Sequence, residues 1–158
     1  MKDLRATLRG LWLQRAPRHF LRRAHPSRAE LGDAGEELAA RHLRRLGWRL
    51  RGRQLRTAHG EVDLWAWHAQ KAWVVEVKTR HVAWHFSGPP RPGGAPRAWS
   101  MVYRPSTSLT PKQRSRLARA ARDLARRCDR QPALALVEVF VSEDGRTVEV
   151  HGPGGCLL

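Results

Sequence analysis

Two short segments near the middle of the chain alternate carboxylates with apolar side chains. Residues 60–64 read GEVDL and residues 75–78 read VEVK. Because successive side chains of a β-strand point to opposite faces, the alternation predicts strands over residues 61–67 and 73–78. Residues 68–70 between them have the length of a hairpin connection, so Asp63 is predicted to lie beside Glu76 on an antiparallel neighbour. The opposite, buried face is predicted to hold Val62, Leu64, Ala66, Val75 and Val77.

Asp63, Glu76 and Lys78 form a set that suits phosphodiester hydrolysis. Carboxylates bind hard divalent cations such as Mg²⁺ through oxygen. The cation polarises a phosphate and lowers the pKa of a bound water. A neighbouring lysine can orient or deprotonate that water, or stabilise the charge that develops. A surface hairpin with solvated Glu–Lys pairs is the alternative interpretation, because an isolated E-x-K triplet is common.

A helix is predicted over residues 33–46, ahead of a strand at 48–55. Its apolar residues follow one helical stripe, and Gly47 is a stop signal. Glu36 has two interpretations. It can form a capping-box-like pair with Asp33 at the N-cap, or it can add a further carboxylate to the metal set.

The second half of the chain supplies another helix and two strands. Thr110 can N-cap a helix, Pro111 fits its first position and Gln113 completes a capping box. Strands are predicted at residues 135–141 and 147–150, with a turn at 144–145. The element order is therefore α-β-β-β-α-β-β, which is typical of an α/β domain.

The charge of the chain predicts a polyanionic partner. Thirty Lys and Arg residues stand against 14 Asp and Glu, which gives a net charge of +16. Acidic and basic residues balance over residues 57–80, whereas residues 1–30 and 112–130 are strongly basic. A carboxylate cluster framed by cationic elements is what a metal-dependent nuclease needs. Trp65 and Trp67 share the predicted face of Asp63, and we interpret them as sheet packing, with base stacking as the alternative.

Three motifs together resemble a known family. They are Gly35-Glu36 with Ala39, the GEVDL of residues 60–64, and the VEVKTR of residues 75–80. This combination resembles the YraN-like family of small, uncharacterised bacterial proteins. That family is similar in turn to the restriction-endonuclease-like, PD-(D/E)xK nucleases, and the archaeal Holliday junction resolvases are among the closest in layout.

The resemblance implies an α/β fold, with a restriction-endonuclease-like α-β-β-β-α-β core and a mixed central sheet flanked by helices. It covers roughly residues 31–150 and carries the nuclease site onto Glu36, Asp63, Glu76 and Lys78. Glu36, Asp63 and Glu76 would hold Mg²⁺ or Mn²⁺, and Lys78 would orient or activate the attacking water. The set of four is intact in this sequence.

Three places depart from the family pattern. Residues 54–56, Gln-Leu-Arg, stand where the family usually has Asn-x-Arg. Lys112 lies one place from the lysine usual in the second helix, and residues 136–138, Leu-Val-Glu, replace an Arg-Phe-Asp. These departures concern substrate contacts and supporting structure.

We therefore predict a Mg²⁺- or Mn²⁺-dependent endonuclease that acts on DNA. Branched or flapped DNA, and a homodimer, are implied by the resemblance to resolvases alone. One alternative is a non-catalytic nucleic-acid-binding protein that retains the nuclease fold. The other is a basic peripheral membrane protein that uses residues 1–30 as an interfacial helix. The side chains predicted to contact nucleic acid are Arg80, Lys112, Arg114, Arg116, Arg119 and Arg122.

The chain is predicted to divide into three parts. Residues 1–30 form a basic extension that is partly helical or disordered, residues 31–151 form the nuclease-like domain, and residues 152–158 form a tail. Residues 81–109, rich in Pro and Gly, are predicted to be a mobile insertion. No run of about 18 apolar residues occurs, so no integral membrane association is expected. Arginines interrupt every apolar stretch at the N-terminus, so we expect no secretory signal and a cytoplasmic protein.

Overall fold

The computed structural model describes residues 2–82, 109–128, 132–146 and 148–154. The predicted insertion at 81–109 lies almost wholly outside these residues, as does most of the predicted tail. The described elements are α1 (Lys2–Arg15), α2 (Pro17–Arg23), α3 (Arg28–Arg45), β1 (Arg49–Thr57), β2 (Gly60–His68), β3 (Lys71–Val82), α4 (Pro111–Cys128), β4 (Ala133–Ser142) and β5 (Val148–Gly154).

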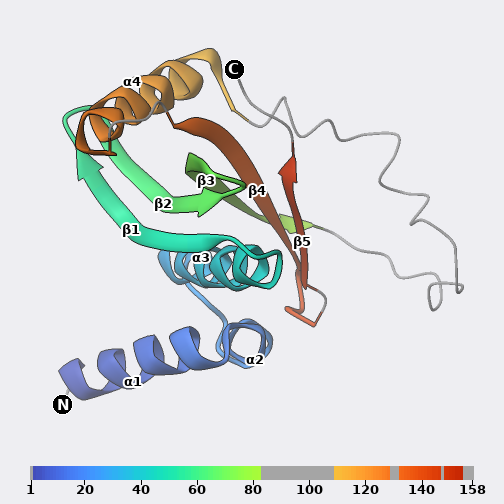
Figure 1. Cartoon of the computed structure of the whole chain (residues 1–158). Helices are drawn as coiled ribbons and strands as arrows, with labels where there is room; N and C mark the ends of the chain where they lie inside the picture. The colour runs from blue at the N-terminus through green and yellow to red at the C-terminus, as the bar shows by residue number, and fades with distance from the viewer. Residues whose placement is uncertain (1, 83–108, 129–131, 147, 155–158) are drawn as a thin grey trace, which may run out of the picture.

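The five strands form one mixed sheet in the order β1-β2-β3-β4-β5. Strands β3 and β4 are parallel, and every other neighbouring pair is antiparallel. Helix α4 lies in the connection between the two parallel strands, as a crossover requires. Figure 1 shows α4 over one face of the sheet and α3 over the other. The mixed α/β fold predicted from the sequence is confirmed.

The hairpin between β2 and β3 follows the predicted pairing. Leu64 pairs with Val75, and the antiparallel register continues to His68 and Lys71 at the turn. Ala69 and Gln70 both have positive φ, as the tight two-residue turns that match strand twist require. The register places Asp63 and Glu76 in neighbouring positions, one residue beyond the Leu64–Val75 pair at which the ladder ends.

Helix α3 begins earlier than predicted. Ser27 is its N-cap, and its side chain accepts a hydrogen bond from the Glu30 N–H while the Glu30 carboxylate accepts one from the Ser27 N–H. This reciprocal capping box satisfies two backbone donors at the helix start. The prediction of Asp33 as N-cap is therefore wrong, because Asp33 lies inside the helix. Glu36 therefore does not cap the helix, because Glu30 occupies the N3 position.

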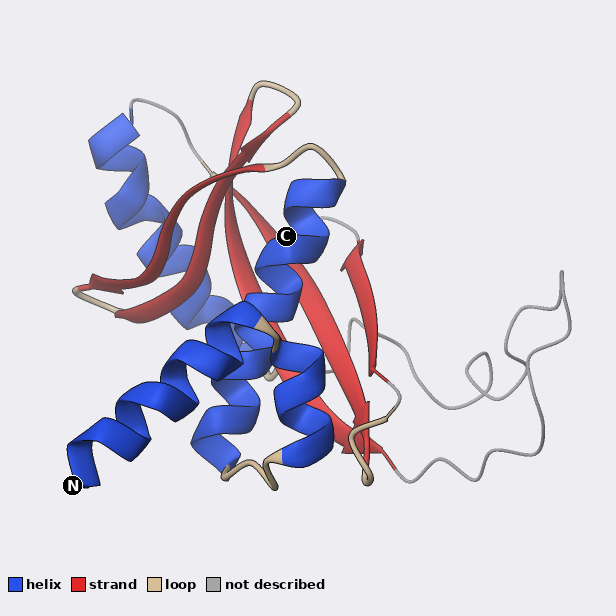
Figure 2. Ribbon diagram, turned by 90° about the horizontal axis from the view of Figure 1, so that it is seen from below, coloured by secondary structure: helices blue, strands red, loops and turns tan. Residues whose placement is uncertain are grey.

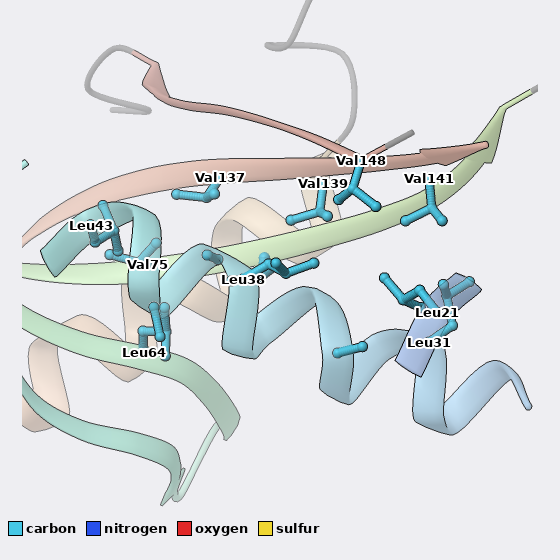
Figure 3. Close-up of a cluster of buried hydrophobic side chains, with 14 of the residues drawn as sticks. Leu21, Leu31, Leu38, Leu43, Leu64, Val75, Val137, Val139, Val141 and Val148 are labelled. Atoms are coloured by element: carbon cyan, nitrogen blue, oxygen red, sulfur yellow. The ribbon is translucent and has the colours of Figure 1, made fainter. Parts of the chain in front are cut away.

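Two apolar cores sandwich the sheet. The core on the α3 side includes Leu64, Ala66, Val75 and Val77, as predicted. Figure 3 shows side chains of α3 packed against those of the strands. The core on the α4 side includes Val62 and Trp65. The prediction that Val62 joins Leu64 in one core is wrong, because Val62 is buried in the α4-side core instead.

Helices α1 and α2 pack on the same side of the sheet as α3 (Figure 2). Leu13, Phe20 and Leu21 are buried in the α3-side core. Arg41 of α3 donates hydrogen bonds to the carbonyl oxygens of Gln14 and Arg15, at the C-terminus of α1, where backbone acceptors lack helical partners. The basic N-terminal residues are thus joined to the main body by apolar packing and by a guanidinium cap.

Among the residues that the structure describes, no helix is both long enough and apolar enough to cross a bilayer.

Candidate active site

The four residues that the sequence singled out line one cavity. It has a volume of about 580 Å³ and lies between the N-terminal half of α3 and strands β2 and β3. Glu36 comes from the helix, Asp63 from β2, and Glu76 and Lys78 from β3. Other lining residues include Pro26, Arg28, Leu31, Gly32, Thr79 and His81.

Asp63 lies where β2 and β3 part. The ladder between the two strands ends at the Leu64–Val75 pair. One residue further on, the Asp63 carboxylate accepts a hydrogen bond from the Val77 N–H at 2.6 Å. A buried backbone donor needs an acceptor, and here the carboxylate supplies the one that β2 does not. This bond holds Asp63 beside the β3 segment that carries Glu76 and Lys78.

Glu76 is held by two cations. Its side chain is buried, and its Oε1 accepts a hydrogen bond from Lys78 Nζ at 2.7 Å. Its Oε2 accepts one from Arg116 Nη2 at 3.1 Å. A buried carboxylate is costly unless it is paired and hydrogen-bonded. Both oxygens of Glu76 meet that requirement.

Arg116 reaches Glu76 from α4, on the other face of the sheet. Its second terminal nitrogen donates to the carbonyl oxygen of Glu61, at the start of β2. The guanidinium passes close to Gly60, where a Cβ would lie 3.2 Å from Nη1. Gly60 also has φ +113°, a conformation that favours glycine. The first residue of the GEVDL motif therefore makes room for the arginine that binds Glu76.

The contact between Arg116 and Glu76 was not predicted from the sequence. The sequence predicts instead that this arginine contacts nucleic acid along with its neighbours on α4. The only signal for this contact is Gly60, a small residue that leaves room for a long side chain from the facing helix. One sequence does not show which of the α4 arginines faces inward.

Glu36 approaches the site because α3 lies very close to β3. A Cβ on Gly35 would fall 1.8 Å from Thr79 Oγ1, so only glycine permits this approach. The Glu36 Oε2 accepts a hydrogen bond from Gln54 Nε2 at 3.2 Å. Gln54 has φ +48°, in the left-handed region that asparagine tolerates better than most residues. This is the position at which the sequence departs from the Asn-x-Arg of the resembling family.

The carboxylates perturb one another. Burial, together with the charges of Glu76 and Glu36, raises the pKa of Asp63 to about 7, although the Val77 N–H and Lys78 act in the opposite direction. Burial also raises the pKa of Glu36. Burial and neighbouring carboxylates therefore both oppose the ionisation of Asp63 and Glu36 in this cavity.

A divalent cation fits this donor set. All three acidic side chains offer oxygen, which is what Mg²⁺ and Mn²⁺ prefer, and a cation would offset the mutual repulsion that raises the pKa of Asp63. In the described parts of the chain no three acidic, His or Cys side chains are already gathered closely enough to share an ion. Both oxygens of Glu76 already accept a hydrogen bond, so an ion would compete with Lys78 and Arg116 for this carboxylate.

The other residues predicted to contact nucleic acid lie outside the cavity lining. Lys112, Arg114, Arg119 and Arg122 are exposed on α4, and Arg80 is exposed near the end of β3. The structure instead places Arg28, at the first position of α3, on the cavity wall. Sequence reasoning missed Arg28 because the helix was predicted to begin five residues later.

A mixed sheet covered by helices on both faces, with a carboxylate-and-lysine cavity where β2 and β3 part, defines an α/β protein with a restriction-endonuclease-like core. Residues 35–139 match the uncharacterised protein family UPF0102, and the chain belongs to that family. The matched range contains Glu36, Asp63, Glu76, Lys78 and Arg116, whereas Arg28 on the cavity wall precedes it.

Relatives from several bacteria share this family. A UPF0102 protein of Syntrophotalea carbinolica is 37% identical over 129 residues, which cover 80% of this chain and 91% of the relative. One of Solibacter usitatus is 36% identical over 119 residues, covering 74% and 76% of the two chains. A shorter match to a UPF0102 protein of Nocardia farcinica is 54% identical over 50 residues, or 32% of this chain and 39% of the relative.

Proposed function

We propose that this protein is a metal-dependent nuclease that hydrolyses DNA. The observation that carries the proposal is the convergence of Glu36, Asp63, Glu76 and Lys78 on one cavity, from three separate elements. A purely structural ion pair needs Glu76 and its cations but does not need Asp63, whose buried carboxylate has a pKa raised to about 7. Buried carboxylates with raised pKa values, gathered in one cavity, are typical of functional sites.

Glu36, Asp63 and Glu76 would hold the ion, Mg²⁺ or Mn²⁺. When bound, such an ion polarises a phosphate and provides a more acidic water. Lys78, whose Nζ lies 2.7 Å from Glu76 Oε1, is placed to orient the attacking water or to stabilise charge on the phosphate. Arg28, on the cavity wall, is available to a phosphate oxygen.

The substrate class follows from charge. The chain carries a net charge of +16, and the exposed arginines of α4 and β3 offer phosphate contacts that do not depend on sequence. We propose DNA as the substrate, with branched or flapped forms first on the resemblance to resolvases. A homodimer is part of the same proposal, and light scattering of the purified protein tests it.

The test is cleavage of a defined panel. Purified protein is incubated with linear, flapped and four-way DNA, and with matched RNA, in Mg²⁺, Mn²⁺ or EDTA. The proposal expects metal-dependent cleavage that is lost in Lys78→Ala and Asp63→Asn but kept in the matched variant Lys71→Ala, an exposed lysine on the same strand. Absence of cleavage on every substrate, or equal cleavage by Asp63→Asn, would refute it.

A second candidate is a nucleic-acid-binding protein without catalysis. One observation favours it, namely that both Glu76 oxygens are already paired, with Lys78 and Arg116. This candidate expects DNA binding that is unchanged by EDTA and no Mn²⁺ uptake by calorimetry. The nuclease proposal expects Mn²⁺ uptake that Glu76→Gln weakens.

A further inference from the structure

A second cavity lies on α3, apart from the carboxylate site. It has a volume of about 340 Å³ and is formed by α2, the C-terminal half of α3 and β5. It shares no lining residue with the carboxylate cavity. Its volume falls at the lower end of the range of about 300–1,000 Å³ that is typical of ligand pockets.

The lining of this cavity is strongly cationic. None of the described side chains that line it is acidic. Apolar side chains, including Pro17, Leu38 and Val150, make up the remainder. The basic lining residues are Arg18, His19, Arg41, His42 and Arg45.

One of these cations serves the structure. Arg41 pairs with Glu37 and also donates to the carbonyl oxygens at the end of α1. Arg41 is therefore engaged by partners within the fold, and the α1 carbonyl oxygens that it contacts are hydrogen-bonded. Glu37 is bound by a second arginine, Arg53, so this carboxylate is neutralised as well.

Two other arginines keep unmatched charge at the cavity. Arg18 donates one N–H to the Val148 carbonyl oxygen at 2.9 Å, which fixes the guanidinium and leaves its other donors available. Arg45 is exposed and forms no ion pair with a described residue. A guanidinium fixed by one hydrogen bond, beside a second one with no ion pair among the described residues, is an arrangement that suits a phosphate.

We propose that this cavity binds a nucleotide phosphate, with Arg18 and Arg45 as its ligands and the apolar lining against the sugar or base. Helix α2 forms one wall of the site through Pro17, Arg18 and His19. Helix α1 is held next to the site by the hydrogen bond from Arg41 to the Gln14 carbonyl oxygen. The proposal requires neither a metal ion nor hydrolysis, so it is separable from the nuclease proposal.

Matched double variants test the site. Arg18→Ala with Arg45→Ala removes two arginines from the cavity. Arg22→Ala with Arg44→Ala removes two exposed arginines from the same two helices, and neither of these lines the cavity. Binding of a fluorescein-labelled oligonucleotide is followed by anisotropy in EDTA. We expect about tenfold weaker binding for the cavity variant, from two lost charge-assisted contacts, and less than about twofold for the control.

Two further measurements distinguish a free nucleotide from an oligonucleotide as the source of the phosphate and exclude misfolding as the cause of lost binding. Calorimetry with adenosine monophosphate shows whether a free nucleotide suffices, and its loss in the cavity variant would also support the site. The single variant Arg45→Glu keeps the Arg18 bond to β5, and circular dichroism verifies its fold. Equal weakening of oligonucleotide binding in both double variants, with no nucleotide binding by the unmodified protein, would overturn the proposal.

Discussion

Replacing Asp63 by asparagine should stabilise the metal-free protein, and more so as the pH rises. The folded-state pKa of Asp63 is about 7, against a reference value of 3.8. The folded protein therefore holds this proton more tightly than the unfolded chain does. The stability that the protonated Asp63 adds to the fold is fully present below about pH 3.8 and is lost as the pH rises through about 7. Asparagine cannot ionise, and its Oδ1 can still accept the bond from the Val77 N–H.

The size of the effect follows from the shift. A difference of about three pKa units corresponds to roughly 4 kcal/mol once Asp63 is fully ionised, because each unit is worth about 1.4 kcal/mol. Part of this free energy of unfolding is already lost at pH 5. The stability of Asp63→Asn relative to the unmodified protein should therefore increase by about 2–3 kcal/mol between pH 5 and pH 8.

Urea unfolding in EDTA at the two pH values measures this difference. The matched control is Glu61→Gln, which removes an exposed carboxylate from the same strand. Its effect on the free energy of unfolding should be small at both pH values. Adding Mn²⁺ should then stabilise the unmodified protein and leave Asp63→Asn unchanged. An advantage of Asp63→Asn that is the same at pH 5 and pH 8 would refute the reasoning.

Three other predictions concern the framework of the site. Gly35→Ala should destabilise the fold by about 1–3 kcal/mol, because the new Cβ overlaps Thr79, and chemical denaturation should show partial recovery when Thr79→Ala is added. Arg116→Ala should cost about 3 kcal/mol by leaving Glu76 buried with one cation fewer, whereas Arg119→Ala, exposed on the same helix, should change stability by less than about 0.5 kcal/mol. The pKa of Glu30 is lowered to about 2 by Arg9 and by the Ser27 N–H, so the stability that Glu30 adds should be present above about pH 4.5 and lost towards pH 2. Thermal unfolding of Glu30→Gln should therefore differ from the unmodified protein at pH 6 and converge with it near pH 2.

The strands of the site could be predicted because their alternation is regular. The apolar and acidic faces of β2 and β3, and the hairpin between them, follow from a side-chain period of two. The family motifs then extended the prediction to Glu36 on the helix. All three carboxylates and Lys78 meet in one cavity.

The remainder depends on contacts that a sequence pattern does not encode. Val62 and Leu64 lie in opposite cores although they are two positions apart on β2, and a pattern of period two does not predict this. The ladder between β2 and β3 ends at Leu64 and Val75, where the Asp63 carboxylate replaces a backbone partner for the Val77 N–H. Arg116 is one of many arginines on α4, and only the packing of the helix over β2 selects it for Glu76. The earlier start of α3 followed from a capping box at Ser27 and Glu30, which competed with the weaker signal at Asp33.

The most direct test of the metal-dependent site is a crystal structure of the protein soaked in Mn²⁺, with anomalous scattering recorded for the ion. The account predicts an anomalous peak in contact with the carboxylates of Asp63 and Glu76, and with Glu76 freed from Lys78 or Arg116. A cavity without a peak in crystals soaked in excess Mn²⁺, with Glu76 still bound to both cations, would contradict it.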